Sequence, residues 1–316
     1  MPTFLERFEV FLSGHQRKTI VDYMAVLRNF EAWALAKTNQ EQLNGELLTS
    51  PRLEAYLKEL AKQGRTPRTQ QKVLAILKLF CRWAADEGWL KGNPASQIES
   101  PAVETVSHEL TSDQRRILKR LVTQQNSPRL AAIFALSYWT GLRGSEVVSL
   151  RLKLCEIDQR TGQITLLEND KGDKVRTLDL HSKTRKALYT YLYETPRTDS
   201  ESRDEESLYV FTSQRAAWLR RNGQPDHLSV RGLEYLWTQA KAQASVSEWE
   251  KIQAVRFHDL RHDFVHRASV AGWSMEEIAV YAGYQLPEGI PTILSTLNYT
   301  LPGQEPLKAR LQKLKG

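Results

Sequence analysis

Cysteine is scarce in this sequence, and its scarcity excludes several kinds of site. The only two cysteines, Cys81 and Cys155, lie far apart in the chain. Two isolated thiols provide neither a disulfide framework nor a thiolate site for a metal ion. They fit a protein of the reducing cytoplasm, which is where we expect this one to work.

Long hydrophobic runs are missing as well. No stretch approaches the roughly 18 consecutive apolar residues that a transmembrane helix requires, so we expect no membrane partner. The first residues carry Glu6, Arg7 and Glu9 within an apolar pattern, so we expect no signal peptide. The sequence also contains no GxxxxGKS or GxxxxGKT loop, which is the pattern that cradles the phosphates of ATP.

Length and charge set the next limits. A chain of 316 residues corresponds to about two domains, and a hydrophobic content of 41% is enough to build a core in each. The 44 lysines and arginines exceed the 37 aspartates and glutamates, which gives a formal net charge of +7. This surplus is compatible with a polyanionic partner, although many basic proteins never bind nucleic acid.

The first hundred residues have the pattern of a small all-α domain, with apolar residues recurring at helical spacing. Ser50-Pro51 and Thr66-Pro67 each have the form of an N-cap followed by a proline in the first turn. Gly64 is placed to end the helix between them. The sequence therefore predicts four helices in this part of the chain.

The remainder is expected to be mostly helical with one small sheet. Ile164 and Leu166 precede, and Leu178 and Leu180 follow, the polar turn 168–173, which predicts a β-hairpin with a longer loop. Helical patterns precede this hairpin and follow it to the end of the chain. The predicted fold class is therefore mainly α with a small antiparallel β-sheet.

Domain boundaries follow from the composition between these parts. Prolines and a loss of periodicity before residue 109 are typical of a linker. We predict an all-α domain at 1–100, a linker at 101–108 and a second domain at 109–316.

The segment TGLRGSE at 140–146 is the first that is suited to chemistry. A glycine turn follows an apolar helix and exposes Arg143 where a new helix begins, with Glu146 in its first turn. The ordinary alternative is a surface arginine beside a helix N-cap.

The segment FHDLRHDF at 257–264 is the second. His258 and Arg261 lie three residues apart, so on a helix they share a face and can reach one anion together. A solvated face of mixed charges is one alternative. Metal binding is another, because His258, His262 and His266 are spaced four residues apart, but no glutamate completes an HExxH pattern and no cysteine is near.

The third segment lies toward the end of the chain and carries tyrosines. AGY at 282–284 is followed by TLNYT at 296–300. Tyr284 or Tyr299 alone would indicate nothing, since most of the 11 tyrosines must belong to the core or the surface.

In this order, the three segments resemble the catalytic motifs of the tyrosine recombinases, the phage-integrase family. The family pattern is a GLR box with a nearby glutamate, a HxLRH box, a GH or GW dipeptide and a tyrosine shortly after. Here GLRGSE supplies Arg143, HDLRH supplies His258 and Arg261, and the YT pair supplies Tyr299. The hairpin lysine of the family matches Lys171 in DKGDKVR. The resemblance covers the whole chain, because the all-α front domain and the linker fit the family's core-binding domain.

This resemblance implies metal-independent cutting and rejoining of DNA strands, with Tyr299 as the nucleophile. Arg143 and Arg261 would clamp the scissile phosphate, since guanidinium groups form paired, charge-assisted hydrogen bonds with its oxygens and stay protonated. His258 would accept or orient the phenol proton, and Lys171 would protonate the leaving 5′ oxygen; in isolation, Lys171 is an ordinary turn lysine. No cofactor and no metal ion are expected.

Three further residues gain roles from the resemblance. Glu146 and His262 would hold the arginines or their helix in place. Tyr284 stands where the family usually has His or Trp, and its hydroxyl would donate the hydrogen bond to the phosphate; the alternative is a packing residue. Tyr299 lies farther downstream than usual, because residues 285–291 look like a short insertion. That insertion is similar to one in transposon-borne members that resolve cointegrates.

The resemblance also implies the partners. We expect a two-domain, C-shaped clamp around duplex DNA with an inverted-repeat core site, and self-association into a synaptic tetramer on that DNA. Accessory DNA motifs or proteins are an open alternative, and the setting would be the nucleoid of a bacterial cytoplasm. Arg215, Arg220 and Arg221 are candidate DNA contacts, although a solvated basic turn fits them equally well.

Three rival functions stay open. A non-catalytic DNA-binding descendant predicts the loss of Arg143, Arg261 or Tyr299, and all three are present. A monomeric topoisomerase would use the same chemistry. A metal-dependent hydrolase built around His258 would lose activity with a chelator. The sequence alone also leaves open integration, excision or resolution as the outcome.

The end of the chain carries an amphipathic pattern. Leu307, Leu311 and Leu314 fall on one helical stripe. Such a helix would dock on a neighbouring protomer, or it would pack on its own domain.

Overall fold

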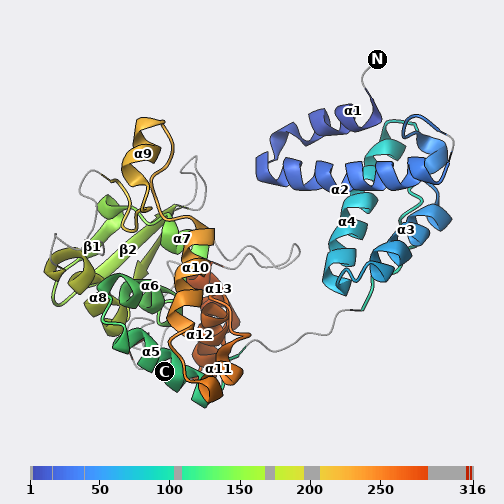
Figure 1. Cartoon of the computed structure of the whole chain (residues 1–316). Coiled ribbons are helices and arrows are strands. Elements are labelled where there is room, and N and C mark those ends of the chain that lie inside the picture. The colour runs from blue at the N-terminus through green and yellow to red at the C-terminus, as the bar shows by residue number, and fades with distance from the viewer. Residues whose placement is uncertain are drawn as a thin grey trace. The chain divides into compact units, whose positions relative to one another are not determined.

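The computed structural model divides the chain into two compact units, Met1–Val106 and Ser107–Gly316 (Figure 1). It describes residues 3–15, 17–38, 40–102, 109–167, 175–195, 207–283, 311, 312 and 314. Each unit has a hydrophobic core of its own.

Unit 1 is a small helical domain, as the sequence pattern predicts. Its helices are α1 (Phe4–Phe11), α2 (Arg17–Ala36), α3 (Ser50–Lys62) and α4 (Pro67–Asp86). Short 3₁₀ turns follow α1 at Leu12–Gly14 and precede α3 at Gly45–Leu47.

Two of the predicted helix starts can be compared with the structure. Thr66 caps α4 by accepting a hydrogen bond from the Thr69 backbone, with Pro67 in the first turn. At α3 the prediction was wrong by one residue, because Thr49 rather than Ser50 is the N-cap. The Ser50 hydroxyl donates instead to the Pro94 carbonyl over 2.6 Å, which ties α3 to the segment after α4.

Aromatic side chains form much of the core of unit 1. Phe8 and Phe80 are fully buried and meet edge to face with ring centroids 5.0 Å apart. Phe4 makes the same kind of contact with Phe80 at 5.2 Å. Such pairs favour the offset and edge-on geometries that aromatic quadrupoles prefer. They join α1 to α4.

Unit 2 combines a three-stranded antiparallel sheet with helices. Its sheet has the order β1 (Cys155–Ile157), β2 (Gly162–Leu167), β3 (Val175–Asp179). Its helices are α5 (Ser112–Gln124), α6 (Pro128–Tyr138), α7 (Gly144–Val148), α8 (Ser182–Tyr189), α9 (Ala216–Arg221), α10 (Val230–Lys241), α11 (Val246–Ile252), α12 (Asp259–Val270) and α13 (Met275–Ala282). A 3₁₀ turn at Leu152–Leu154 precedes β1, and a π-helical turn at Thr190–Glu194 continues α8.

The predicted hairpin is confirmed. Strands β2 and β3 pair antiparallel, with Ile164 opposite Leu178 and Leu166 opposite Arg176. The connection between the strands, which contains Lys171, lies outside the described residues. The sequence did not predict β1, whose three residues carry too little alternation to be recognised.

Helix α6 is the centre of unit 2. Its residues from Ala132 to Tyr138 are all buried, and it packs against α5, α7, α8 and α12 (Figure 1). A helix that is apolar on every side belongs in a core. In the described part of the chain, neither α6 nor any other helix is long and apolar enough to cross a membrane.

The described residues of the tail pack on unit 2 itself. Leu311 and Leu314 are buried in its core. The Gln312 side chain donates to the Leu180 carbonyl over 2.9 Å and accepts from the Ser182 backbone over 2.8 Å. Packing on the chain's own domain, one of the two alternatives for this tail, is therefore what the structure shows.

Candidate active site

A glycine turn between α6 and α7 brings the first candidate segment against α12. Gly141 has φ +70°, and a Cβ atom there would overlap the ring of Phe264. Only glycine combines this conformation with so close an approach. The turn places Arg143 at the start of α7, where its backbone N–H donates to Glu146 Oε2 over 2.7 Å.

Glu146 is the centre of a cluster of three arginines. Its Oε1 accepts from Arg143 Nη1 at 2.9 Å and from Arg176 Nη2 at 3.0 Å. Its Oε2 lies 3.9 Å from Arg261 Nη1. Three guanidinium groups thus surround one carboxylate, which leaves a net charge of +2. Such a cluster is suited to an anion with two charged oxygens.

Arg261 lies on α12 and is the most enclosed of the three, with 1% of its side chain exposed. Its Nη1 donates to the Gly141 carbonyl over 2.7 Å. The glycine turn therefore positions both arginines. Arg143 follows it in the sequence, and Arg261 is held by the hydrogen bond to the Gly141 carbonyl. The sequence prediction that these arginines lie together is consistent with this geometry.

The end of α13 completes the cluster. Gly283 follows the helix with φ +69°, the left-handed conformation that commonly ends helices. Arg143 donates through Nη2 to the Gly283 carbonyl, and its Nη1 lies 3.5 Å from the Ala282 carbonyl. Tyr284, the next residue, lies outside the described residues, as do Lys171 and Tyr299.

Two histidines lie beside this cluster on α12. His258 is the N-cap of the helix, and its ring meets that of His262 edge to face, with centroids 4.6 Å apart. Partial burial, followed by the positive charges of His262 and Arg261, lowers the pKa of His258 below its ordinary value. A histidine with a lowered pKa is neutral near pH 7, and a neutral imidazole can accept a proton.

A buried ionic network holds α12 in place. Asp263 has no exposed surface and pairs with Arg115 on α5 at 2.9 Å and with Arg267 one turn later at 2.8 Å. It also accepts from the Leu110 backbone over 3.1 Å. The Arg267 guanidinium lies 4.2 Å from the centre of the Tyr138 ring. These contacts fix the helix that carries His258 and Arg261 against α5 and α6.

The metal-site alternative gains no support from the geometry. Among the residues that the structure describes, no three His, Cys, Asp or Glu side chains are grouped to hold a metal ion. His266, the third histidine of the predicted row, lies 2.7 Å from Glu109.

Tyr281 on α13 lies near enough to Arg176 for that charge to act on its phenol, but its environment is unsuited to attack on a phosphate. The ring is buried, and the hydroxyl donates to the Asp179 carbonyl over 2.7 Å. Burial, together with the nearby negative charge of Asp179, raises the pKa of this phenol. A phenol that is hard to ionise is a poor nucleophile.

The three candidate DNA contacts near α9 differ in their surroundings. Arg215 and Arg221 are exposed. Arg220 is instead held by Asp226, with Nη1 and Oδ2 2.6 Å apart and the carboxylate 5% exposed. Arg220 therefore has an internal partner that the sequence did not indicate.

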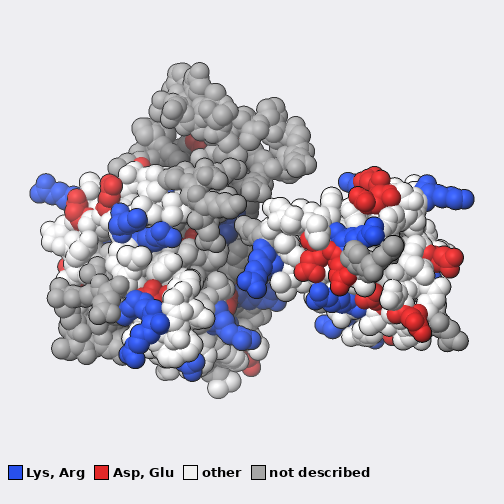
Figure 2. Space-filling view, turned by 90° about the horizontal axis from the view of Figure 1, so that it is seen from above, with Lys and Arg blue, Asp and Glu red and all other residues white. Residues whose placement is uncertain are grey.

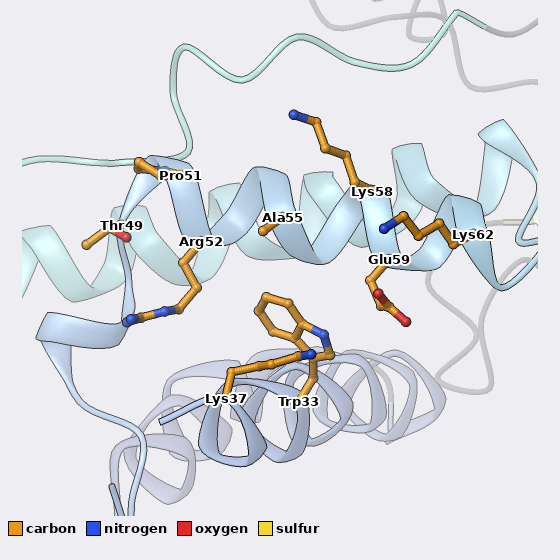
Figure 3. A pocket seen from close by; sticks show the side chains of 9 residues that line it. All are labelled: Trp33, Lys37, Thr49, Pro51, Arg52, Ala55, Lys58, Glu59 and Lys62. Carbon is orange, nitrogen blue, oxygen red and sulfur yellow. The ribbon is translucent and has the colours of Figure 1, made fainter. Parts of the chain in front are cut away.

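Unit 1 has a basic hollow between α2 and α3 (Figure 3). Trp33 on α2 and Lys37, which follows the end of that helix, lie opposite Arg52 and Lys62 on α3. Acidic and basic side chains are otherwise interspersed on the face of this unit seen in Figure 2. The residues that line the hollow are Trp33, Lys37, Thr49, Pro51, Arg52, Ala55, Lys58, Glu59 and Lys62. With four basic residues against one acidic residue, the hollow is a candidate site for phosphate groups.

Arg176 is the member of the arginine cluster that the sequence analysis missed. Its signal lies in the strand alternation, because Arg176, Leu178 and Leu180 occupy successive positions of one face. Leu178 and Leu180 are buried. An arginine in line with core residues is unusual and marks a buried charge with a partner.

Comparisons with known proteins show the family to which this chain is similar. The model of the phage integrase family matches residues 109–289. The chain is 28% identical over 279 residues to the tyrosine recombinase XerD of Lacticaseibacillus casei, covering 86% of this chain and 85% of that protein. It is 25% identical over 194 residues to a XerC-like tyrosine recombinase of Caldanaerobacter subterraneus, covering 58% of this chain and 49% of that protein.

Solved structures show the same fold. The Tn1549 transposon integrase in complex with circular intermediate DNA matches with a TM-score of 0.65 and 15% identity, over 99% of this chain and 98% of that chain. A lambda integrase tetramer bound to a Holliday junction matches with a TM-score of 0.63 and 15% identity, over 90% and 77%. Because the family model covers more than half of the chain, this protein belongs to the phage integrase family of tyrosine recombinases, enzymes that cleave and rejoin DNA strands.

Proposed function

We propose that this protein recombines specific DNA sites through a 3′-phosphotyrosyl intermediate at Tyr299, without a metal ion or ATP. The observation that carries this proposal is the arginine cluster around Glu146, with Oε1 bonded to Arg143 at 2.9 Å and to Arg176 at 3.0 Å. Its net positive charge is placed beside His258, a histidine whose pKa is lowered.

The arginine cluster matches the charge of the reacting phosphate. Attack on a phosphodiester increases the negative charge on its two non-bridging oxygens. Arg143 and Arg261 would each bind one oxygen with donors that are not used on Glu146, and they stay charged at any working pH. A preorganised positive site stabilises the transition state more than the ground state.

Proton transfers accompany the bond changes. As the Tyr299 oxygen bonds to phosphorus, its phenol proton passes to neutral His258. As the bond from phosphorus to the 5′ oxygen breaks, Lys171 donates a proton to that oxygen. Tyr284, the residue after Gly283 in the chain, would donate a neutral hydrogen bond to the phosphate. The phosphotyrosyl ester conserves the energy of the broken bond, so the reverse attack by a 5′ hydroxyl rejoins the strand.

The partner in this proposal is duplex DNA with an inverted-repeat core site. Both units of each protein molecule would bind this DNA, and a tetramer of the protein would bring two such sites together. The basic hollow of unit 1 and the exposed Arg215 and Arg221 of unit 2 supply contacts to phosphates. The lambda integrase neighbours, bound to DNA as a dimer and as a tetramer, support such an assembly.

Transposon cointegrate resolution is the biological role that we propose within this activity. The insertion at 285–291 and the fold shared with a transposon integrase support it. A plasmid with two directly repeated copies of the core site tests it. Resolution into two circles is expected, whereas joining of separate plasmids without resolution would contradict this role.

The covalent intermediate provides the central test of the chemistry. In a DNA site with a nick just beyond the scissile phosphate, cleavage releases a short fragment that carries the 5′ hydroxyl. When this fragment diffuses away, the strand cannot be rejoined and the enzyme stays covalently bound to the DNA. We expect a covalent band on a denaturing gel in excess EDTA, with the nucleotide on the peptide that contains Tyr299. Tyr299→Phe should bind DNA and form no band, and Tyr281→Phe is the matched control that should still form one. A band that persists in Tyr299→Phe, or that requires added metal ion, would contradict the proposal.

A further inference from the structure

Arg176 occupies a position that ordinary folding does not explain. It lies on β3 opposite Leu166, on the face whose neighbours Leu166 and Leu178 are buried. Its side chain is 9% exposed. A core-facing strand position normally takes an apolar residue, since burying a charged group is unfavourable unless it is paired.

The pairing of Arg176 is incomplete within the described residues. Nη2 contacts Glu146 at 3.0 Å, but Nε and Nη1 are buried and have no hydrogen-bond partner there. A buried donor without an acceptor is uncommon in a native structure and calls for a reason beyond stability. Among the residues that the structure describes, Glu146 is thus the one side chain that accepts from this guanidinium.

The surroundings of Arg176 supply that reason. Glu146 Oε1 accepts from both Arg176 and Arg143, so one carboxylate oxygen is shared by two guanidinium groups. The Arg176 guanidinium also lies against Gly283, where a Cβ atom would overlap it. Gly283 is the residue whose carbonyl accepts from Arg143. Arg176 therefore contacts both of the groups that orient Arg143.

We propose that Arg176 is a positioning residue of the recombinase site, which acts through Glu146 on the two arginines that clamp the phosphate. This inference rests on the proposed function. Arg176 draws part of the negative charge of Glu146 toward β3, so that Arg143 and Arg261 keep their positive charge for the phosphate. Arg176 also fixes the Glu146 carboxylate from β3, and this ion pair holds α7 against that strand.

Without Arg176, Glu146 would pair more fully with Arg143 and Arg261. Both arginines would then offer less positive charge to the phosphate, most of all when its negative charge grows during attack. The loss belongs to the cleavage step rather than to DNA binding, because many other basic groups contribute to binding.

The test compares single-turnover cleavage of the nicked site by wild type, Arg176→Met, Arg176→Lys and Arg160→Met. Methionine keeps the length of the aliphatic stem without the charge, and lysine keeps the charge with a different donor geometry. Arg160, exposed in the turn between β1 and β2, is the matched control. We expect Arg176→Met to cleave about 10- to 100-fold more slowly, Arg176→Lys to recover part of the rate, and Arg160→Met to equal wild type. DNA affinity should change by less than about twofold, because the contact is internal.

A second substrate separates positioning from a merely structural role. Replacing one non-bridging oxygen of the scissile phosphate by a methyl group removes one negative charge from the transition state. If Arg176 acts through the charge of the arginine clamp, the difference between wild type and Arg176→Met shrinks on this substrate. An equal difference on both substrates, or wild-type cleavage by Arg176→Met, would overturn the inference.

Two controls make the outcomes distinct. Thermal melting establishes whether Arg176→Met is folded, and Arg176→Gln provides the same comparison if it is not. Failure of the wild type to form a covalent complex would count against the proposed function itself. If the wild type cleaves the site and Arg176→Met cleaves it at the same rate, the role of Arg176 is refuted and the proposed function stands.

Discussion

The ring of Phe264 on α12 fills the space that a side chain at Gly141 would need, and this contact fixes the turn that carries Arg143. Gly141→Ala should destabilise unit 2 by about 3 kcal/mol, because alanine pays for a positive φ and for the overlap with the ring. It should also slow strand cleavage, since the Gly141 carbonyl accepts from Arg261.

Gly223→Ala is the control for this substitution. Gly223 has a similar φ of +65°, but nothing lies within 4 Å of an added Cβ atom. Only the backbone cost of about 1 kcal/mol should remain, with cleavage unchanged. Chemical unfolding and covalent-complex formation measure both effects. Equal destabilisation by the two substitutions would show that Phe264 does not restrict Gly141.

A second prediction concerns the network below the site. Asp263→Asn leaves the half-buried Arg115 and the buried Arg267 without a full negative partner and should destabilise unit 2 by about 3–5 kcal/mol. Hydrogen exchange of α12 should increase with it. Asp113→Asn, which loses only exposed ion pairs with Arg116 and Lys251, should have little effect. If Asp263→Asn melts like the wild type, α12 is held by its apolar packing alone.

The parts of the site that the sequence predicted are those encoded locally. Arg143 follows a glycine turn, and His258 and Arg261 share one helical segment, so short motifs place them. The hairpin from β2 to β3 was predictable in the same way, from alternation on both sides of a polar turn. The family pattern then joined segments that are more than a hundred residues apart.

The parts that were missed depend on contacts across the fold. Asp263 meets Arg115 from 148 positions away, and no local pattern marks such a pair. Arg220 was predicted as a DNA contact because of its basic neighbours. In the structure it forms an ion pair with Asp226, which follows α9 in the chain. Arg176 gave a signal in its strand alternation, but its partner Glu146 is known only from the three-dimensional arrangement.

A third prediction concerns pH. Partial burial and then the charge of His262 lower the pKa of His258. If neutral His258 accepts the Tyr299 proton, the cleavage rate should fall as the pH drops through this lowered pKa. His262→Gln removes the neighbouring charge, so the pKa rises and the acidic limb of the pH–rate profile moves to higher pH.

His266→Gln is the matched control for this shift. His266 lies on the same helix but pairs with Glu109 and does not contribute to the pKa of His258. Its profile should coincide with that of the wild type. An acidic limb that stays in place in His262→Gln, or one that is absent from the wild type, would be evidence against His258 as the proton acceptor.

A last prediction concerns the basic hollow of unit 1. Lys37 and Lys62 line it beside Trp33 (Figure 3). If they bind phosphates of the DNA backbone, each releases a counterion on binding. Plotted as the logarithm of affinity against the logarithm of salt concentration, the slope should become shallower by about 0.9 for each lysine that is replaced by glutamine.

This loss should be independent of sequence, because a phosphate contact does not distinguish bases. Lys37→Gln should therefore weaken binding to the core site and to unrelated duplex DNA by the same factor. The double variant with Lys62→Gln should flatten the salt slope by about twice as much as Lys37→Gln alone. Lys91→Gln is the control, since Lys91 is exposed in unit 1 but does not line the hollow. Titrations at four salt concentrations measure both slopes. If Lys37→Gln and Lys91→Gln change the slope equally, the hollow has no special part in binding, and unit 1 meets the DNA through another face.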